Sequence, residues 1–414
     1  MKNSRLTAFE IIYGVLNNDD YSNLSLDSAF DKNNSSDNAF ISKLVLGVIE
    51  RRLTLDYILK PYLNSRPKPK VRILLYMGVY QLYFMDKVPS NAAVNESVEL
   101  AKAVGCGYYT KLINAVLHKV DSNRIDIDTI DDLSARYSCP ESLIKMWQKH
   151  YGEDNTLKIL GEINNIAPVF AVPNTLFVDE EELLYELMDE KAECEITSEV
   201  VKINSHINVK KSRAFKNGLY HIQDLSSFNC AKVLKAEEGQ TVIDVCSAPG
   251  GEAFTVAERM NNSGEVYALD LNNNRVELIK EGAERLGINI IKAAVNDAGV
   301  YNPDLPKADR VLCDVPCSGF GIIRRKPEIR YKSLDDIKGL YGIQYNILKT
   351  SAEYLKRGGR LVYSTCTLNK NENEKIAERF IKEDKRFKLI EMKTVFPSEN
   401  GDGFFYAVME KIDD

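Results

Sequence analysis

Two cysteines, each placed just past a short apolar run, are the residues of this chain best suited to do chemistry. Cys317 lies in the segment VLCDVPCSG (311–319), and Cys366 lies in the segment YSTCT (363–367). Short apolar runs predict buried strands, so each thiol is expected at the carboxyl edge of a parallel sheet, where open α/β folds bind ligands. With Asp314 beside the first thiol, the pattern indicates covalent catalysis.

A thiol and a carboxyl group meet the needs of methyl transfer to a pyrimidine. The C5 carbon of cytosine is too poor a nucleophile to take a methyl group until a thiolate adds at C6. A free thiol has a pKa near ~8.5, so its surroundings must activate it. Asp314 can protonate the base at N3, or hydrogen-bond to it, while the adduct forms. The C5 proton must then leave, to a second cysteine or to water.

Each of these signals also has a purely structural interpretation. A single cysteine is more often a small buried apolar residue than a nucleophile. The sequence Asp314-Val315-Pro316 also fits a turn, and Ser364-Thr365 also fits a helix cap. The joint occurrence of the two patterns at two strand ends favours the catalytic interpretation.

A glycine turn earlier in the chain predicts a cofactor site. Asp244 lies near the end of an expected strand, 241–245, and the turn through Gly250 and Gly251 leads into a helix that begins near Ala253. Backbone amides at such a helix N-terminus face a ligand. Because the turn does not match G-x-G-x-x-G, we expect S-adenosylmethionine and not a dinucleotide. The same turn also fits a plain strand-to-helix connection, which favours glycine.

Two further strand ends support an adenosine site. Asp270 ends the second expected strand, 266–270, and Asp297 follows the third, 289–295. An acid in this position commonly accepts hydrogen bonds from a ribose, although it also often caps the next helix. Three successive strand ends with suitable groups favour the adenosine interpretation.

These residues must be positioned by a sheet, and the last part of the chain has the pattern of one. From about residue 225 apolar strands alternate with amphipathic helices, which predicts βαβ units and a mostly parallel, Rossmann-like sheet. The expected strands are 241–245, 266–270, 289–295, 310–313 and 360–364, with 404–411 as a late edge strand.

The first half of the chain, to about residue 224, has a different character. Apolar residues recur three and four apart from Arg5 to about Val120, which predicts an all-α domain. Strands at 170–176 and 200–203 flank an acidic helix and predict a small α+β module. We therefore expect a multidomain protein with an all-α domain at 1–125, linker helices and a small α+β bridging subdomain at 126–224, and an α/β domain at 225–414.

Composition limits the partners of the protein. A net charge of −6 excludes non-specific coating of RNA, but local basic clusters remain. The clusters are Lys60, Arg66, Lys68, Lys70 and Arg72 in the first domain, and Arg324, Arg325 and Lys326 near the proposed site. Such runs are usually solvated faces, and the triplet is the stronger candidate for phosphate contact because of its position.

Cysteine use and hydropathy indicate the compartment. The eight cysteines are scattered over a long chain, so no disulfide framework is expected, and no ligand set for a metal is complete. No run approaches the ~20 apolar residues that cross a bilayer, and no signal peptide precedes the first helix. We expect a cytoplasmic protein without a metal, not bound to a membrane, and a monomer.

In these residues the chain resembles the cytosine-C5 RNA methyltransferases of the NOL1/NOP2/Sun family. The resemblance rests on 244–251, on 314–319 together with 364–367, and on Gly403-Phe404-Phe405. The front half, through 87–102 and 112–117, is similar to the NusB-like domain fused to such enzymes. The resemblance covers essentially the whole chain and implies a substrate in 16S ribosomal RNA.

The family pattern implies a role for each matched residue. Cys366 would be the nucleophile on C6, Cys317 the thiol that assists product release, and Asp314 the contact to cytosine. Beside Asp314, the implied cofactor site consists of Cys246, Ser247, Ala248, Pro249, Gly250, Gly251, Glu252, Asp270 and Asp297. The family usually has lysine after the two glycines, where this chain has Glu252.

Two alternatives stay open at this stage. The same chemistry could act on transfer RNA, and only the NusB-like front favours the ribosome. The protein could also be an RNA-binding assembly factor with a degenerate methyltransferase fold, of which Glu252 would be a symptom.

Overall fold

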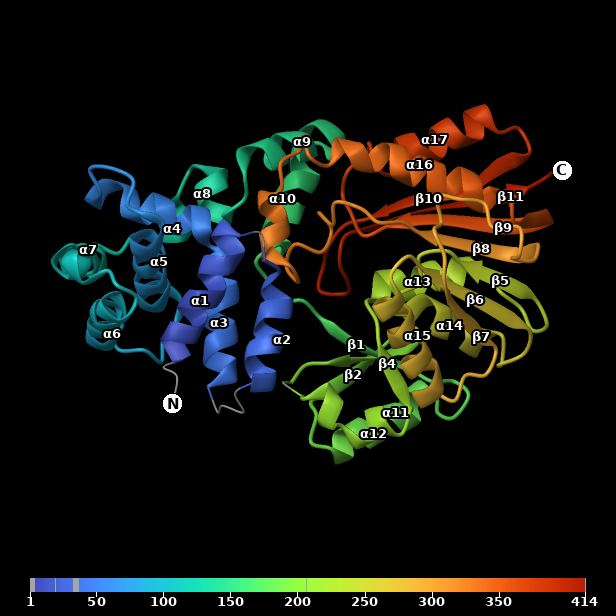
Figure 1. Cartoon of the computed structure of the whole chain (residues 1–414), viewed down its shortest axis with the longest axis horizontal. Coiled ribbons are helices and arrows are strands. Elements are labelled where there is room, and N and C mark those ends of the chain that lie inside the picture. Colours follow the sequence, from blue (N-terminus) through green and yellow to red (C-terminus); the bar gives the residue numbers. More distant parts are fainter. Residues whose placement is uncertain (1–3, 19, 33–36, 206, 414) are drawn as a thin grey trace. The chain divides into compact units, whose positions relative to one another are not determined.

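A computed structural model describes residues 4–18, 20–32, 37–205 and 207–413, and the chain divides into two units by its internal contacts (Figure 1). The first unit is Met1–Asn165 together with Ile323–Lys332, and the second is Ile166–Ile322 with Ser333–Asp414. A short segment from late in the chain thus belongs to the first unit. The predicted boundaries after residues 125 and 224 stay predictions.

All regular secondary structure in the described part of the first unit is helical, as the apolar periodicity predicts. Its α-helices are α1 (Ser4–Asn17), α2 (Ser22–Lys32), α3 (Asn38–Glu50), α4 (Arg52–Leu59), α5 (Pro69–Phe84), α6 (Ser90–Ala103), α7 (Thr110–Ser122), α8 (Leu133–Tyr137), α9 (Glu141–Tyr151) and α10 (Glu153–Glu162). Short 3-10 turns are η1 (Lys60–Tyr62), η2 (Gly107–Tyr109), η3 (Ile127–Thr129) and η5 (Pro327–Tyr331). No helix among the described residues is long and apolar enough to cross a membrane.

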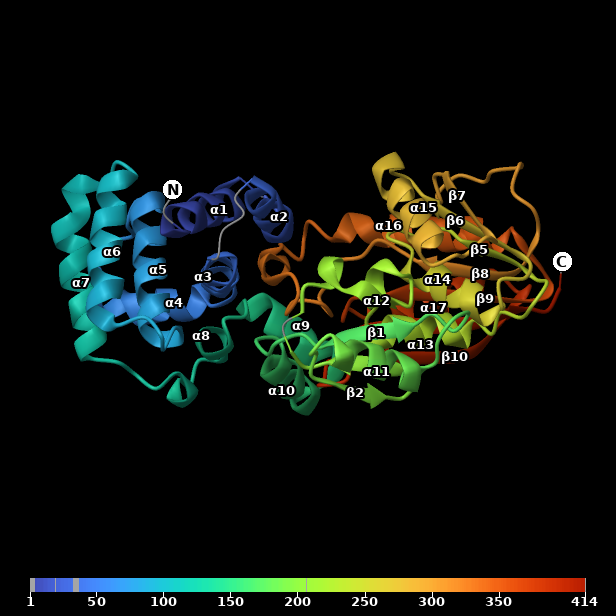
Figure 2. The ribbon, with the colours of Figure 1, turned by 90° about the horizontal axis from the view of Figure 1, so that it is seen from below.

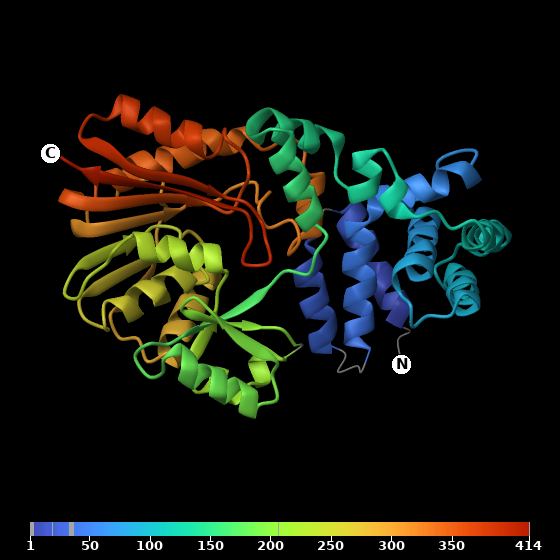
Figure 3. The same cartoon turned by 180° about the vertical axis from the view of Figure 1, so that it is seen from behind.

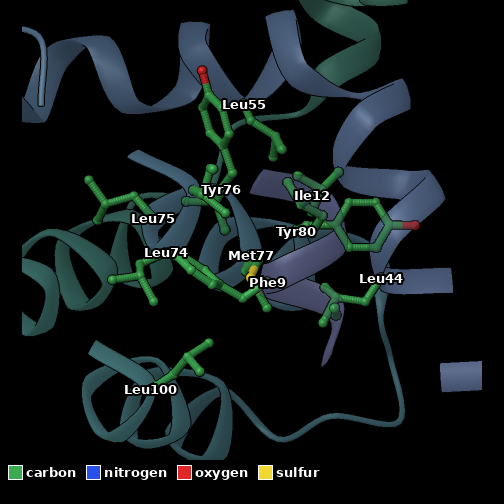
Figure 4. Close-up of a cluster of buried hydrophobic side chains, with 14 of the residues drawn as sticks. Phe9, Ile12, Leu44, Leu55, Leu74, Leu75, Tyr76, Met77, Tyr80 and Leu100 are labelled. Atoms are coloured by element: carbon green, nitrogen blue, oxygen red, sulfur yellow. The ribbon is translucent and has the colours of Figure 1, made fainter. Parts of the chain in front are cut away.

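Helix α5 is the centre of this unit. Its sequence is apolar on nearly every side, and Val71 and the run from Ile73 to Leu82 are buried, which is the pattern of a helix enclosed by others. Figure 2 shows α5, α6 and α7 side by side. Side chains from α1, α3, α4 and α6 meet those of α5 in one core, drawn in Figure 4.

The late segment 323–332 is fixed to the first unit by Arg330. This side chain is fully buried, and its guanidinium donates to the carbonyl oxygens of Glu50, Ser138 and Ile163, each at 3.1 Å, and to Asn164 Oδ1 at 2.9 Å. The three carbonyls lie at the C-terminal ends of α3, α8 and α10, where the last carbonyls lack partners within the helix. One cation therefore satisfies three helix ends.

The second unit contains two sheets. The smaller sheet, drawn in shades of green in Figure 3, has the strand order β2-β3-β1-β4, and its pairs are antiparallel. Its elements are β1 (Val169–Pro173), α11 (Glu180–Asp189), β2 (Cys194–Thr197), β3 (Val200–Ile203), η4 (Val209–Lys211), α12 (Arg213–Lys216) and β4 (Tyr220–Ile222). The acidic helix α11 begins at a capping box of Asp179 and Glu182, which explains why its start is readable in the sequence.

The larger sheet has the order β10-β11-β9-β8-β5-β6-β7, and β9, β8, β5, β6 and β7 run parallel. Its strands are β5 (Thr241–Asp244), β6 (Glu265–Asp270), β7 (Ile291–Val295), β8 (Ala308–Asp314), β9 (Leu355–Thr365), β10 (Phe387–Val395) and β11 (Phe404–Lys411). The order reverses between β5 and β8, and open α/β sheets bind ligands at such a point. The predicted Rossmann-like domain is confirmed.

Helices cover both faces of this sheet (Figure 1). They are α13 (Leu225–Val233), α14 (Gly251–Arg259) and α15 (Asn273–Arg285) on one face, and α16 (Lys338–Ala352) and α17 (Glu374–Glu383) on the other. Along β8 the side chains alternate: Val311 and Cys313 pack with α16 and α17, whereas Leu312 packs with α13 and α14. This double cover explains the continuous apolar runs from which the strands were predicted.

One expected feature of the sheet is wrong. Strand β11 was expected at the edge, but it lies between β9 and β10, antiparallel to both. Its residues are buried on both faces, whereas β10, with several exposed side chains, forms the edge. The sequence of β10 is half polar, as an edge strand permits, and the strand was therefore not predicted.

Candidate active site

The two thiols of the sequence pattern meet at one point. Strands β8 and β9 are parallel neighbours, with Asp314 opposite Ser364, so the segments that follow them leave the sheet side by side. Cys317 Sγ and Cys366 Sγ lie 3.3 Å apart, both as free thiols. The structure thus brings together the sulfur atoms of residues 49 positions apart in the chain.

Asp314 is the last residue of β8, three positions before Cys317, and is half-buried. Its Oδ1 atom accepts a hydrogen bond of 2.9 Å from the Ser364 hydroxyl. Burial, and after it the negative charge of Glu252, raises the pKa of Asp314 to about 7. A carboxyl group with such a pKa can either donate or accept a proton near neutral pH.

The loop that carries Cys317 is held by a buried carboxylate that the sequence did not reveal. Glu372 Oε2 accepts from the Ser318 backbone N–H (2.8 Å) and from Gln344 Nε2 (2.9 Å). Its Oε1 accepts from the Ser318 hydroxyl (2.5 Å) and from Asn369 Nδ2 (2.9 Å). Four donors on one fully buried carboxylate make this loop rigid. Nothing in the local sequence distinguishes Glu372 from the exposed acids that commonly follow a strand.

The loop that carries Cys366 is tied to the same network. The Thr365 hydroxyl donates to Asn373 Oδ1 (2.6 Å), and Asn373 Nδ2 donates to the carbonyl oxygen of Thr367 (2.8 Å). The hydroxyls of Thr367 and Ser318 are hydrogen-bonded at 2.7 Å. The two cysteine loops are therefore positioned relative to each other by side chains that are themselves fully buried.

The glycine turn after β5 has the form expected of a cofactor site. Gly250 has φ of 112°, a left-handed conformation, and an added Cβ would lie 2.5 Å from the ring of Phe254. Neither carboxylate oxygen of buried Asp244, nor the Ser247 hydroxyl, makes a hydrogen bond within the described part of the chain. A ligand with donor groups, such as the ammonium group of S-adenosylmethionine, would fit these unpaired acceptors.

Asp270 and Asp297, the acids at the ends of the next two strands, form contacts within the segments that follow them. Asp270 accepts from the backbone N–H of Asn272 and pairs with Arg275, both at 3.0 Å, and Asp297 accepts from the backbone N–H of Gly299 at 2.9 Å. They lie at the ends of neighbouring strands β6 and β7, as the sequence predicts. Their contacts to a ribose, and those of the turn from Cys246 to Glu252, stay predictions.

The basic residues that were predicted to contact RNA differ in their exposure to solvent. Lys68 and Lys70 are exposed in the first unit. The Arg324 side chain is only 2% exposed and pairs with Glu162 at 3.5 Å, so the expectation that it offers an exposed charge to RNA is wrong. Arg325 and Lys326 are half-buried, and their contact to RNA stays a prediction.

Fold and site together define a class of protein: a Rossmann-like methyltransferase domain, with two free thiols at its strand ends, preceded by a helical domain. Two family models match the chain, "16S rRNA methyltransferase RsmB/F" at residues 231–410 and the NusB family at residues 2–122. The chain belongs to the RsmB/F family of 16S rRNA methyltransferases. S-adenosylmethionine is accordingly its cofactor, as predicted.

Curated relatives support this over the whole length. The chain is 38% identical over 396 residues to the probable ribosomal RNA small subunit methyltransferase B of Bacillus subtilis, covering 92% of this chain and 88% of the relative. It is 32% identical to the protein of the same name from Synechocystis, covering 99% and 100%. Among solved structures, PH0851 matches with a TM-score of 0.82 at 26% identity over 99% of both chains.

Proposed function

We propose that the protein methylates C5 of a cytosine in 16S ribosomal RNA through a covalent adduct between Cys366 and C6. The observation that carries the proposal is the 3.3 Å separation of the Cys317 and Cys366 sulfur atoms at the ends of neighbouring strands, next to the carboxyl group of Asp314. The reaction needs one thiol to form a bond to the base and a second group, either another thiol or water, to remove a proton.

The roles of the two thiols follow from their surroundings. The hydrogen bond to Cys366, and after it burial, raises the pKa of Cys317 well above that of a free thiol. Because a thiol with a raised pKa is a poor source of thiolate, we assign the nucleophile to Cys366 and the product-release step to Cys317. This assignment agrees with the roles that the family resemblance implies.

In the proposed sequence, the Cys366 thiolate adds to C6 while Asp314 hydrogen-bonds to N3, which leaves an electron pair at C5. S-adenosylmethionine, when bound, supplies the methyl group that this pair attacks, and S-adenosylhomocysteine leaves. A base then removes the C5 proton, and the electrons of that C–H bond restore the C5–C6 double bond and expel the Cys366 thiolate. Cys317, after losing its own proton to water, or a water molecule acts as that base.

The choice of ribosomal RNA rests on the relatives and on the front domain. The Bacillus and Synechocystis relatives carry the name of small-subunit ribosomal RNA methyltransferases, and the NusB match covers residues 2–122 of the helical unit. We expect Lys68, Lys70, Arg325 and Lys326 to contact RNA phosphates, and the enzyme to act as a monomer in the cytoplasm.

The test uses cells with and without the protein. Bisulfite sequencing should find one 16S cytosine that is protected only when the parent protein is present, and unprotected with Cys366→Ala. Protection of a transfer RNA cytosine instead would show that the substrate is transfer RNA. Full methyl transfer by Cys366→Ala would contradict a covalent adduct through Cys366. A parent protein that binds no S-adenosylmethionine in calorimetry would favour the assembly-factor alternative.

A further inference from the structure

Cys317 and Cys366 are close enough to form a bond with each other. Their sulfur atoms lie 3.3 Å apart, and no other two cysteines are hydrogen-bonded to each other in the described part of the chain. A disulfide has an S–S length of about 2.05 Å, so the two sulfur atoms need to approach by only about 1.3 Å. A modest rotation of each side chain about its Cα–Cβ bond moves the sulfur atoms by this amount.

The backbone around the two thiols keeps them at this distance. The two cysteine loops follow neighbouring parallel strands, β8 and β9, and are tied to each other beyond the sheet. The backbone N–H of Gly321 donates to the carbonyl oxygen of Cys366 at 3.0 Å, and the hydroxyls of Ser318 and Thr367 are hydrogen-bonded at 2.7 Å. Because the fold holds the thiols together, a reaction between them is intramolecular and is faster than the reaction with a thiol from solution.

The same two thiols are accessible to small reagents. Cys317 and Cys366 are both half-buried, and a path that lets a cytosine base reach Cys366 also lets a small hydroperoxide reach it. The remaining cysteines lack this combination of access and a thiol partner. Four of them are buried, and two are half-buried but have no cysteine as a hydrogen-bond partner in the described part of the chain: Cys106, Cys139, Cys230 and Cys313, and Cys194 and Cys246.

We propose that Cys317 and Cys366 form a redox switch, in which a hydroperoxide oxidises the two thiols to a disulfide and a thiol reductant restores them. The inference rests on the proposed function, because it concerns the regulation of the same two sulfur atoms. The disulfide occupies both the nucleophile and the thiol that assists product release, so methyl transfer stops until the bond is reduced. Disulfides that form in a reducing compartment are usually of this transient kind.

The oxidation takes two steps. The Cys366 thiolate attacks one oxygen of the hydroperoxide, an S–O bond forms, the O–O bond breaks, and the oxygen that leaves takes up a proton. The product on Cys366 is a sulfenic acid. Cys317 gives its proton to water and attacks the sulfenic sulfur, the S–S bond forms, and the hydroxide that leaves is protonated to water. The two thiols together lose two electrons, which reduce one peroxide bond.

The first test follows the sulfur chemistry alone, without RNA or cofactor. The reduced parent protein is treated with hydrogen peroxide, the remaining thiols are alkylated, and tryptic peptides are analysed by mass spectrometry. We expect peptides 311–324 and 361–370 to be joined, with a mass below their sum by two hydrogen atoms. Peptide 311–324 also contains Cys313, so Cys313→Ala is the matched control and should form the same link. Cys317→Ala should not form it.

The second test measures methyl transfer in a single turnover before oxidation, after oxidation and after treatment with dithiothreitol. The activity of the parent should fall in proportion to the fraction of cross-linked protein and return in full on reduction. In Cys317→Ala the sulfenic acid on Cys366 has no thiol partner, so further peroxide converts it to sulfinic acid, which dithiothreitol does not reduce. This variant should therefore lose its covalent complex with RNA permanently.

Three results would overturn the switch: two separate thiols after peroxide treatment, sulfinic acid on Cys366 beside a free Cys317, or cross-linked protein that keeps its activity. A reduced parent protein that transfers no methyl group would instead overturn the proposed function. The joined peptides would still decide, in that case, whether the two thiols form a reversible disulfide.

Discussion

The backbone N–H of Gly321 donates to the carbonyl oxygen of Cys366 at 3.0 Å, so the loop after β8 is tied to the peptide of the proposed nucleophile. An added Cβ on Gly321 would lie 1.9 Å from the carbonyl oxygen of Gly403 and 2.8 Å from that of Cys366. Contact with two backbone atoms leaves no room to adjust without moving one loop.

Replacing Gly321 with alanine should therefore damage both stability and activity. We expect the free energy of unfolding to fall by about 1–3 kcal/mol, as overpacking does, and methyl transfer to slow by about 10²-fold because the thiol is displaced. Gly342→Ala in helix α16 is the matched control, since an added Cβ there meets nothing within 4 Å. Urea unfolding and single-turnover rates measure both effects, and a Gly321→Ala protein that matches the control would contradict this account.

Replacing Cys317 with alanine should trap the reaction after methyl transfer. The adduct through Cys366 can form, but the group proposed to remove the C5 proton is missing, so elimination of the thiol is slowed. A denaturing gel should show a covalent complex of protein and RNA. Cys194→Ala, which removes a thiol from strand β2 of the smaller sheet, should release its product as the parent does. Rapid release of methylated RNA from Cys317→Ala would show that water, and not Cys317, removes the C5 proton.

Glu372→Gln tests the buried carboxylate beneath the Cys317 loop. The amide can accept through one oxygen only, so the two donors on the other side lose their partner. We expect a loss of about 3 kcal/mol in the free energy of unfolding, since hydrogen bonds to a charged group contribute about 1.5–3 kcal/mol each. Urea unfolding measures the loss, and the exposed Glu378→Gln on α17 is the control. Similar stability of the two variants would show that Glu372 is dispensable.

The raised pKa of Asp244 predicts how the stability of the ligand-free protein changes with pH. Burial, and after it the charge of Glu252, raises the pKa of Asp244 well above its ordinary value of 3.8, so the folded state holds a proton that the unfolded state releases. From about pH 4 upward, folding stability then falls with rising pH, by up to about 1.4 kcal/mol per unit. Asp244→Asn removes this dependence.

The melting temperature of Asp244→Asn, relative to that of the parent, should therefore increase between pH 5 and pH 8. The exposed Asp304→Asn controls for a general change in charge and should show a constant difference over the same range. A parallel course for the parent and Asp244→Asn would mean that Asp244 is ionised in the folded protein.

The strands that position the site could be predicted because they are buried on both faces. Runs such as the one that ends at Cys313 are continuously apolar, and polar residues mark the point where each strand ends. The register of β8 on β9 then brings the two cysteine loops together. Parallel neighbouring strands end at the same edge of the sheet. The proximity of the two cysteine loops therefore follows from the fold class.

Other parts of the site depend on tertiary contacts that leave no local pattern. Glu372 follows a strand and precedes a helix, as many exposed acids do, and only the packed structure shows its four donors. Arg324 and Arg330 belong to a basic-looking stretch, yet one pairs with Glu162 and the other binds carbonyls at helix ends. Charge alone does not distinguish a solvated cation from one that is buried with partners.

The position of residues 323–332 has a consequence for engineering. The chain enters the helical unit, leaves it, and returns for ten residues in the middle of the methyltransferase sequence. A cut after Asn165 therefore yields a front fragment with three uncapped helix ends, and a back fragment with a displaced strip that carries Arg330. Transplanting the helical unit onto another enzyme would require moving two pieces of chain, which makes the unit hard to exchange by simple gene fusion.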